Sequence, residues 1–306
     1  MEATFKILET SRNIYLKFLE GYTLEQLNKI PEGFSNNLIW NLGHIIVAQQ
    51  GLVYRLSGLP INVTDEMNEK YRNGSKPTGT TTQAELDAYK AKLKSLRSLP
   101  QALKDVLERI PASAHPMDVM RTGCSMLGNL ETEQSFDQQQ DATDRMLAIF
   151  PGLVNYWYNY SHHGKRIEVD TDADSIAEQF LWTLHGEKPS PLHIDVMQAS
   201  LILYAEHEFN ASTFTARVCA STLSDMHSCI TGAIGSLRGP LHGGANEAAM
   251  ELIEKMDNAD DAEQKLLGML ERKEKIMGFG HAIYSESDPR NAVIKEWSEK
   301  LAKANG

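Results

Sequence analysis

The chain has 306 residues and a formal net charge of −11 at pH 7, with 42% hydrophobic and 23% charged residues. This composition is ordinary for a soluble globular protein, and the length suits about two domains. The negative charge argues against a nucleic-acid partner or an anionic membrane, although a local pocket can still be positive. No apolar run is long enough to span a membrane, and residues 1–10 have no signal-peptide layout.

The three cysteines have no metal-ligand spacing. Cys219 and Cys229 lie in apolar helical surroundings, so both are interpreted as small core residues. We expect a reducing, cytoplasmic environment.

Residues 1–72 are predicted to form a helical hairpin. Thr23, with Gln26 three residues later, has the pattern of a capping box, and residues 35–56 have the apolar periodicity of a long helix. Residues 41–45 read NLGHI and place His44 beside the apolar stripe of that helix.

This stretch resembles the amino-terminal half of DinB-like proteins, which are four-helix bundles that hold a divalent metal with three histidines. Only His44 matches a ligand position, because the second half of the bundle does not follow. A metal site normally needs three or four protein donors. We therefore expect no metal cofactor, and His44 is interpreted as a helical histidine before it is considered a ligand.

Residues 73–83 are predicted to be a linker, because glycine, proline, serine and threonine dominate them. Helical patterns with short breaks follow, with no sustained period-2 alternation, so the fold class is all-α. Pro151 and Gly152 are expected to interrupt a helix over residues 141–160. Residues 161–164, which include His162 and His163, are expected to form an exposed turn.

A second signal lies at residues 238–247, which read RGPLHGGANE. Proline and the glycine pair break regular structure, and the following residues begin an amphipathic helix. His242 should therefore lie at a helix amino terminus, where backbone N–H groups favour negative charge. The pattern suits a donor to an oxygen that becomes negative, although a glycine-rich turn with an incidental histidine explains it about equally well.

Two further motifs flank this one in the chain. Residues 203–213 read LYAEHEFNAST, residues 278–284 read GFGHAIY, and Asp288, Pro289 and Arg290 follow. In this order the three motifs resemble the citrate synthase family, and HEFNAST is similar to its 2-methylcitrate synthase branch. The segment HPMDVMRTG at residues 115–123 also matches, and the resemblance covers about residues 83–306.

The resemblance implies an all-α fold with a partial large domain at residues 84–245 and the start of a small domain at residues 246–306. It implies a transferase of propionate catabolism or the tricarboxylic acid cycle, which condenses propionyl-CoA or acetyl-CoA with oxaloacetate. His242 matches the donor to the thioester oxygen, and His281 matches the residue that polarises the oxaloacetate carbonyl. The remaining matches are two residues that hold oxaloacetate and a loop that lies against CoA: His207, Arg290, Gly278, Phe279 and Gly280.

The family's general base is an aspartate beyond Arg290, and residues 290–306 contain no aspartate. Loss of a general base typically costs about 10²–10⁴ in rate. We therefore expect a composite chain, half of a DinB-like bundle joined to an incomplete synthase, with little or no condensing activity. Two alternatives stay open: a non-catalytic helical protein that binds oxaloacetate, and a metal-binding DinB-like protein. Members of the family usually dimerise through the large domain, so a homodimer is one expected assembly.

Overall fold

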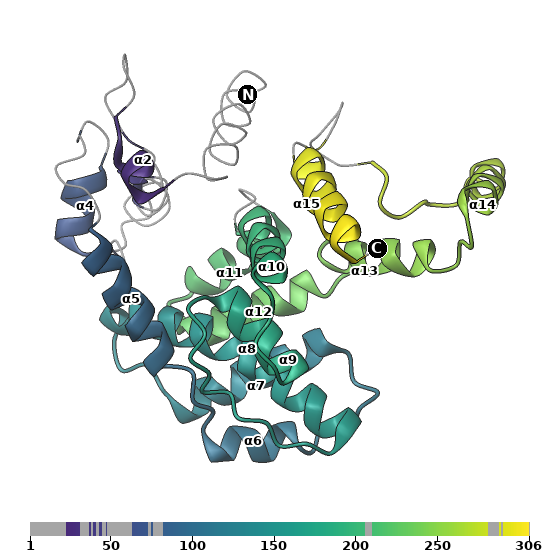
Figure 1. The fold of residues 1–306 in the computed structure, drawn as a ribbon. Coiled ribbons are helices and arrows are strands. Elements are labelled where there is room, and N and C mark those ends of the chain that lie inside the picture. Colours follow the sequence, from purple (N-terminus) through teal and green to yellow (C-terminus); the bar gives the residue numbers. More distant parts are fainter. Residues whose placement is uncertain are drawn as a thin grey trace. The chain divides into compact units, whose positions relative to one another are not determined.

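A computed structural model describes residues 23–30, 37, 39–40, 43–44, 47, 63–72, 75, 82–205, 210–280, 288 and 290–305. These residues form helices, and no strand occurs among them, so the all-α prediction is confirmed (Figure 1). None of the helices in these ranges has the length and apolar character that crossing a bilayer requires. The chain divides into two compact units, Met1–Leu96 with Ser135–Gln140, and Arg97–Gln134 with Asp141–Gly306.

The first unit contains α2 (Leu24–Asn28), α4 (Asp65–Tyr71), α5 (Gln83–Ser95) and the short 3₁₀ helix η2 (Phe136–Gln138). The expected capping box is present at α2, where the Thr23 hydroxyl accepts from the Gln26 N–H and the Gln26 side chain accepts from the Thr23 N–H. The predicted linker at residues 73–83 lies before and at the start of α5, and most of it falls outside the described residues. The family boundary placed there stays a prediction.

The second unit contains α6 (Gln101–Leu107), α7 (Pro116–Leu130), α8 (Gln139–His163) and α9 (Ile176–His185). The first two residues of α8 belong to the first unit. It continues with α10 (Pro191–Tyr204), α11 (Ala211–Ala220), α12 (Met226–Leu237), α13 (Gly244–Ile253), α14 (Ala259–Glu271) and α15 (Arg290–Asn305). Helix α12 packs against both α7 and α11, and α10 packs against α9 and α15 (Figure 1). The motif at residues 115–123, on α7, and the one that runs into α11 therefore lie on helices that both pack against α12, which the His242 motif follows.

Side-chain caps explain where several of these helices begin. Ser175, Ser190 and Asn210 each accept a hydrogen bond from a backbone N–H in the first turn of α9, α10 and α11. Pro116 and Pro191 occupy the first helical position, where a missing N–H has no consequence. Gly186 ends α9 in the left-handed conformation, with a φ of 78°.

The core of the second unit lies between α6, α7 and α8. It is built from apolar residues that include Leu103, Leu107, Val119, Leu127, Ile149, Leu153, Tyr156 and Trp157. A Cβ on Gly123 would lie 2.6 Å from the Leu153 side chain, so α7 and α8 approach closely there. Cys229 is buried as expected, and Cys219 is half-buried.

Two expectations about α8 are wrong. Pro151 does not interrupt the helix, which runs from Gln139 to His163. A proline inside a helix costs about 3 kcal/mol, and the buried residues Ile149, Leu153 and Trp157 on either side of it offset that cost. His162 and His163 are exposed as expected, but they form the last turn of α8 rather than a separate turn, and both rings lie against Tyr158.

A charged network fastens the segment after α8 to the segment after α6. The Arg166 Nε and Nη2 atoms each lie 2.7 Å from an oxygen of Glu108, and the Tyr156 hydroxyl donates to Glu108 at 2.7 Å. These hydrogen bonds, Arg166 first, lower the pKa of Glu108 to about 2. Burial, followed by the Glu108 contact, raises the pKa of Tyr156 to about 12.

The lowered pKa of Glu108 predicts an acid-sensitive contribution to stability. A carboxyl whose pKa is lower in the folded state stabilises the fold above its ordinary pKa of 4.5, and that contribution is lost as the pH falls towards 2. The Glu108→Gln variant should therefore unfold at a lower temperature than the wild type at pH 6. The difference should shrink between pH 4.5 and pH 2, measured by circular dichroism. An equal difference at both ends of that range would contradict the role of the charge.

Candidate active site around His242

His242 lies in the turn between α12 and α13, directly before Gly243, the residue that precedes the first turn of α13. The turn folds back over the end of α12. A Cβ on Gly243 would lie 2.6 Å from the Leu237 carbonyl oxygen, and one on Gly244 would lie 2.9 Å from the Arg238 carbonyl oxygen. Only glycine fits this close backbone approach. The predicted position of His242 at a helix amino terminus is therefore confirmed.

The imidazole of His242 is oriented by the start of α11. Its Nε2 atom accepts a hydrogen bond from the Ser212 backbone N–H at 3.2 Å and lies 2.9 Å from the Ser212 hydroxyl oxygen. That hydroxyl oxygen also lies 2.8 Å from the Asn210 side-chain oxygen, and Asn210 caps α11. Because Nε2 accepts a backbone hydrogen, the ring proton of the neutral imidazole lies on Nδ1.

Burial lowers the pKa of His242 from its ordinary value. Desolvation disfavours the imidazolium, so the ring is neutral at neutral pH. A neutral ring with one fixed N–H is a hydrogen-bond donor rather than a charged partner. It suits an oxygen that gains negative charge during a reaction.

Two contacts hold α13 in place beside this turn. The Glu247 carboxylate lies 2.8 Å from His115 Nε2, at the start of α7. His115 Nδ1 accepts from the Met117 N–H at 3.1 Å, so Nε2 carries the hydrogen that Glu247 accepts. The Asn246 side chain donates to the Tyr204 hydroxyl at 2.6 Å. Residues from α7 and α10 therefore fix the helix that follows His242.

A cationic group that the sequence analysis did not identify lies at the end of α12. Arg121 Nη1 is 2.9 Å from Asp118 Oδ1, and Arg238 Nε is 3.6 Å from Asp118 Oδ2. Two guanidinium groups thus share one carboxylate, which leaves a formal surplus of positive charge in a chain whose net charge is −11. Arg238 precedes His242 by four residues, so its positive charge lies next to the turn that holds His242.

The loop of Gly278, Phe279 and Gly280 also lies beside α13. Both glycines have left-handed φ angles, 92° and 80°, which other residues rarely adopt. A Cβ on Gly278 would lie 3.2 Å from the Ala249 side chain on α13. Phe279 is 71% exposed. The structure thus places this loop next to the helix that His242 precedes, and its predicted contact with CoA stays a prediction.

Arg290 begins α15, and its side chain is bound by Asp288. Arg290 Nε lies 2.9 Å from Asp288 Oδ1 and Nη2 lies 2.5 Å from Oδ2, while Asp288 Oδ1 also accepts the Arg290 backbone N–H. This pair orients the guanidinium and stabilises the first turn of the helix. His207 and His281 lie outside the described residues, so the gathering of all four residues around one substrate stays a prediction.

His44, the weak metal candidate, is fixed by packing within the first unit. Its Nδ1 atom lies 2.6 Å from the Tyr71 carbonyl oxygen, and its ring stacks on Trp40 with the centroids 4.7 Å apart. Because a carbonyl oxygen accepts, Nδ1 carries the hydrogen. These contacts orient the His44 ring, and its interpretation as a helical histidine without a metal stays a prediction.

The family model described as citrate synthase, C-terminal domain, matches residues 78–306. The chain belongs to the citrate synthase family. The DinB superfamily model matches residues 7–123, so the predicted likeness to both groups is confirmed.

Among curated relatives, the 2-methylcitrate synthase of Shewanella oneidensis is 65% identical over 269 residues, covering 87% of this chain and 71% of the relative. Citrate synthase 2 of Bacillus subtilis is 42% identical over 229 residues, covering 72% of this chain and 60% of the relative. The alignment with the Shewanella relative covers 269 residues, which is more than the predicted resemblance over residues 83–306 can hold. The two family models also overlap at residues 78–123. Likeness to the synthases thus reaches into the DinB-like part.

Solved structures give the same family. A Thermoplasma acidophilum citrate synthase, in a ternary complex with carboxymethyl coenzyme A and oxaloacetate, matches with a TM-score of 0.68 and 26% identity. This match covers 93% of this chain and 71% of that one. Citrate synthase of Thermotoga maritima matches with a TM-score of 0.62 and 35% identity, covering 72% and 59% of the two chains.

Proposed function

We propose that the chain carries the condensing site of a 2-methylcitrate synthase, which joins propionyl-CoA to oxaloacetate and accepts acetyl-CoA as a smaller substrate. The support is membership of the citrate synthase family, the 65% identity to a relative named 2-methylcitrate synthase, and the geometry at His242. In this reaction a carboxylate base, an aspartate in the family, takes a proton from the carbon next to the thioester carbonyl, and the enol adds to the ketone of oxaloacetate. The resulting thioester is hydrolysed to free CoA.

The main structural support for this function is the single N–H donor of the His242 ring. Ser212 occupies Nε2, so Nδ1–H is the atom that donates to the thioester oxygen as it becomes enolic. The neutral ring donates a hydrogen bond and keeps its proton. The positive potential at the amino terminus of α13 further favours negative charge on that oxygen. Ser212 and Asn210 act by positioning: they hold the ring from the side opposite to the donor.

The remaining assignments follow the family motifs. His281 is proposed to polarise the oxaloacetate ketone, and His207 and Arg290 to hold its carboxylates. Asp288 orients the Arg290 guanidinium for this role. The loop of Gly278 to Gly280 is proposed to lie along CoA, where its backbone conformation allows close approach.

A coupled measurement tests the proposal. Release of free CoA from propionyl-CoA should depend on oxaloacetate, and calorimetry should detect oxaloacetate binding. Omission of oxaloacetate is the control for simple thioester hydrolysis. The proposed function fails if neither oxaloacetate-dependent CoA release nor oxaloacetate binding is found. Binding without CoA release would support the non-catalytic alternative, and the measured rate also tests the expectation of little or no condensing activity.

We also propose that the protein forms a homodimer through the outer face of α11. Phe214 and Val218, four residues apart and 61% and 51% exposed, lie on one face of this helix. Large apolar residues grouped on a helix face mark an interaction surface. Sedimentation velocity at micromolar concentration should show a dimer, and Phe214→Asp should shift the distribution towards monomer. A wild type that sediments as a monomer would contradict the assembly.

A further inference from the structure

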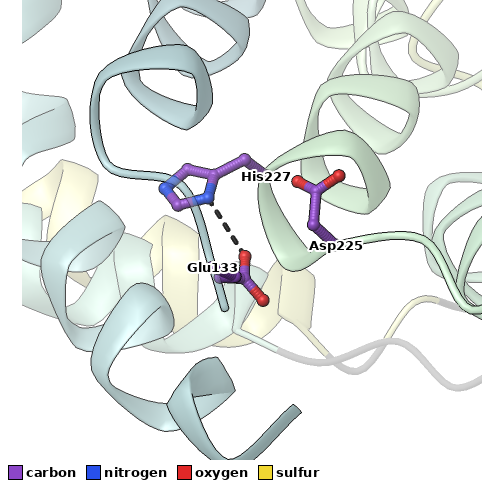
Figure 2. Close-up of side chains that lie close together, drawn as sticks. All are labelled: Glu133, Asp225 and His227. Carbon is purple, nitrogen blue, oxygen red and sulfur yellow. Dashed lines mark hydrogen bonds and ion pairs between the residues drawn. The ribbon is translucent and has the colours of Figure 1, made fainter. Parts of the chain in front are cut away.

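Three metal-ligand side chains meet at the amino terminus of α12, away from the His242 turn. Glu133 comes from the segment after α7, Asp225 caps α12, and His227 lies in the first turn of that helix (Figure 2). One ligand atom of each side chain lies within 4.8 Å of the others. The side chains of His227 and Glu133 are 3% and 7% exposed, so this group is largely enclosed.

The contacts of Glu133 place it and His227 at coordination spacing. Glu133 Oε1 accepts the Met226 N–H at 2.8 Å and lies 3.1 Å from His227 Nδ1. Two ligands of a tetrahedral Zn²⁺, with bonds of about 2.0–2.2 Å, lie about 3.4 Å apart. The Glu133 and His227 atoms are already near this separation. Asp225, now bonded to Ser228 through both oxygens, would complete the set by a side-chain rotation.

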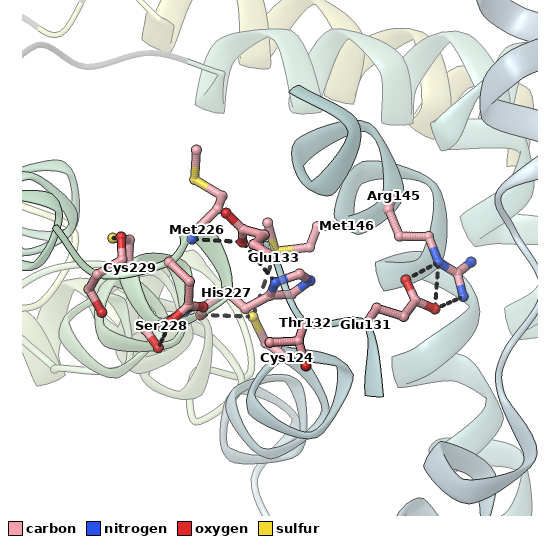
Figure 3. Close-up of polar contacts among 12 residues, drawn as sticks. Cys124, Glu131, Thr132, Glu133, Arg145, Met146, Met226, His227, Ser228 and Cys229 are labelled. Carbon is pink, nitrogen blue, oxygen red and sulfur yellow. Dashed lines mark hydrogen bonds and ion pairs between the residues drawn. The ribbon is translucent and has the colours of Figure 1, made fainter. Parts of the chain in front are cut away.

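His227 is buried and packs against α7. A Cβ on Gly128 would lie 2.7 Å from the His227 Cβ, so α7 packs directly on this residue. The Cys124 thiol donates to the His227 carbonyl oxygen at 3.5 Å (Figure 3). His227 Nε2 is buried and has no hydrogen-bond partner among the described residues. The buried ring faces Glu133 with Nδ1, so it loses little freedom on binding an ion.

The group combines two carboxylates with one imidazole, and His227 lies 3.1 Å from Glu133, within ion-pair distance when its ring is protonated. Glu133 and Asp225 bring two formal negative charges, and Arg145 on α8 is bound through Nε and Nη2 to Glu131 (Figure 3). The amino terminus of α12 offers about half of a positive charge. A divalent cation would neutralise both carboxylates, and one imidazole with two carboxylates is a donor set that zinc and its neighbours accept.

We propose that Glu133, Asp225 and His227 form a binding site for one divalent transition-metal ion of the Zn²⁺ type. The ion would tie the end of α7 to the start of α12, with His227 bound through Nδ1 and its proton on Nε2. The site is structural, because it lies at the end of α12 opposite to His242. It is independent of the proposed condensing function.

Calorimetric titration with ZnCl₂, followed by the visible absorption of a CoCl₂-loaded sample, tests this site. The wild type should bind one Zn²⁺ per chain, and Co²⁺ should give the bands of a nitrogen- and oxygen-liganded ion. Asp225→Asn keeps a good helix cap but weakens the ligand, so it should lower the affinity at least about tenfold. His163→Gln, at the exposed end of α8, is the matched control for incidental histidine binding and should leave the affinity within about twofold.

Glu133→Gln provides a second variant, which still accepts the Met226 N–H and decides the matter if Asp225→Asn folds poorly. Circular dichroism without metal checks the fold of each variant. The proposal is overturned if the wild type binds no Zn²⁺ at 1:1 stoichiometry. It is equally overturned if folded Asp225→Asn and Glu133→Gln bind as tightly as the wild type, or if only His163→Gln loses the ion.

Discussion

Replacement of His242 with alanine is expected to lower whatever kcat the chain shows for oxaloacetate-dependent CoA release by about 10²–10³, the usual effect of removing one donor to a developing oxyanion. The reason is geometric. Nε2 of His242 accepts from Ser212, so Nδ1–H is the only ring donor left for a substrate oxygen. KM for propionyl-CoA should change much less than kcat, because the hydrogen bond strengthens only as the oxygen gains charge.

Two variants make this expectation specific. His242→Gln keeps an N–H donor and should retain more activity than His242→Ala. His163→Ala, at the exposed end of α8, should leave kcat unchanged. The pH dependence adds a further check. Because burial lowers the pKa of His242, the wild-type activity that depends on this ring should persist at neutral pH and fall only when the pH drops below the lowered value. A His242→Ala rate within about threefold of the wild type would remove His242 from the reaction.

The turn that carries His242 is predictable from sequence because its cause is local. Proline and two glycines end one helix and allow the backbone to reverse before the next, and no distant residue is needed for that. The partners of the turn are not predictable in this way. Ser212 is 30 residues from His242, and His115 is 132 residues from Glu247. Their pairing depends on how whole helices pack, and the composition of either segment alone does not indicate it.

The fold shows the same limit at Pro151. Local propensity argues for a break, and that argument treats the helix as if it were isolated in water. In the folded chain, Ile149 and Leu153 are fully buried on either side of the proline. A Cβ on Gly152 would lie 3.0 Å from the Val169 side chain, so the segment after α8 also packs against this point. Burial of several apolar side chains outweighs one missing hydrogen bond. This balance of free energies cannot be inferred from Pro151 and Gly152 alone.

The same packing predicts the largest loss of stability from a single substitution. Trp157 is 1% exposed in the core of α6, α7 and α8, and its indole N–H donates to the Ile110 carbonyl oxygen at 3.2 Å. Trp157→Ala should lower the free energy of unfolding by about 3–5 kcal/mol, because it leaves a large cavity and an unpaired carbonyl. Urea unfolding followed by far-ultraviolet circular dichroism measures the change without relying on tryptophan emission.

The neighbouring residue gives a matched control on the same helix. Tyr158 is 36% exposed, and its ring meets only the His162 and His163 rings among the aromatic side chains of the described residues. Tyr158→Ala should therefore cost no more than about 1 kcal/mol. Trp157→Phe, which keeps most of the ring but removes the N–H, should fall between the two alanine variants. If Trp157→Ala and Tyr158→Ala unfold at the same urea concentration, the second unit does not depend on the α6–α7–α8 core in the way the structure indicates. In that case, the reason given for the unbroken helix through Pro151 is wrong as well, because both rest on the same buried contacts.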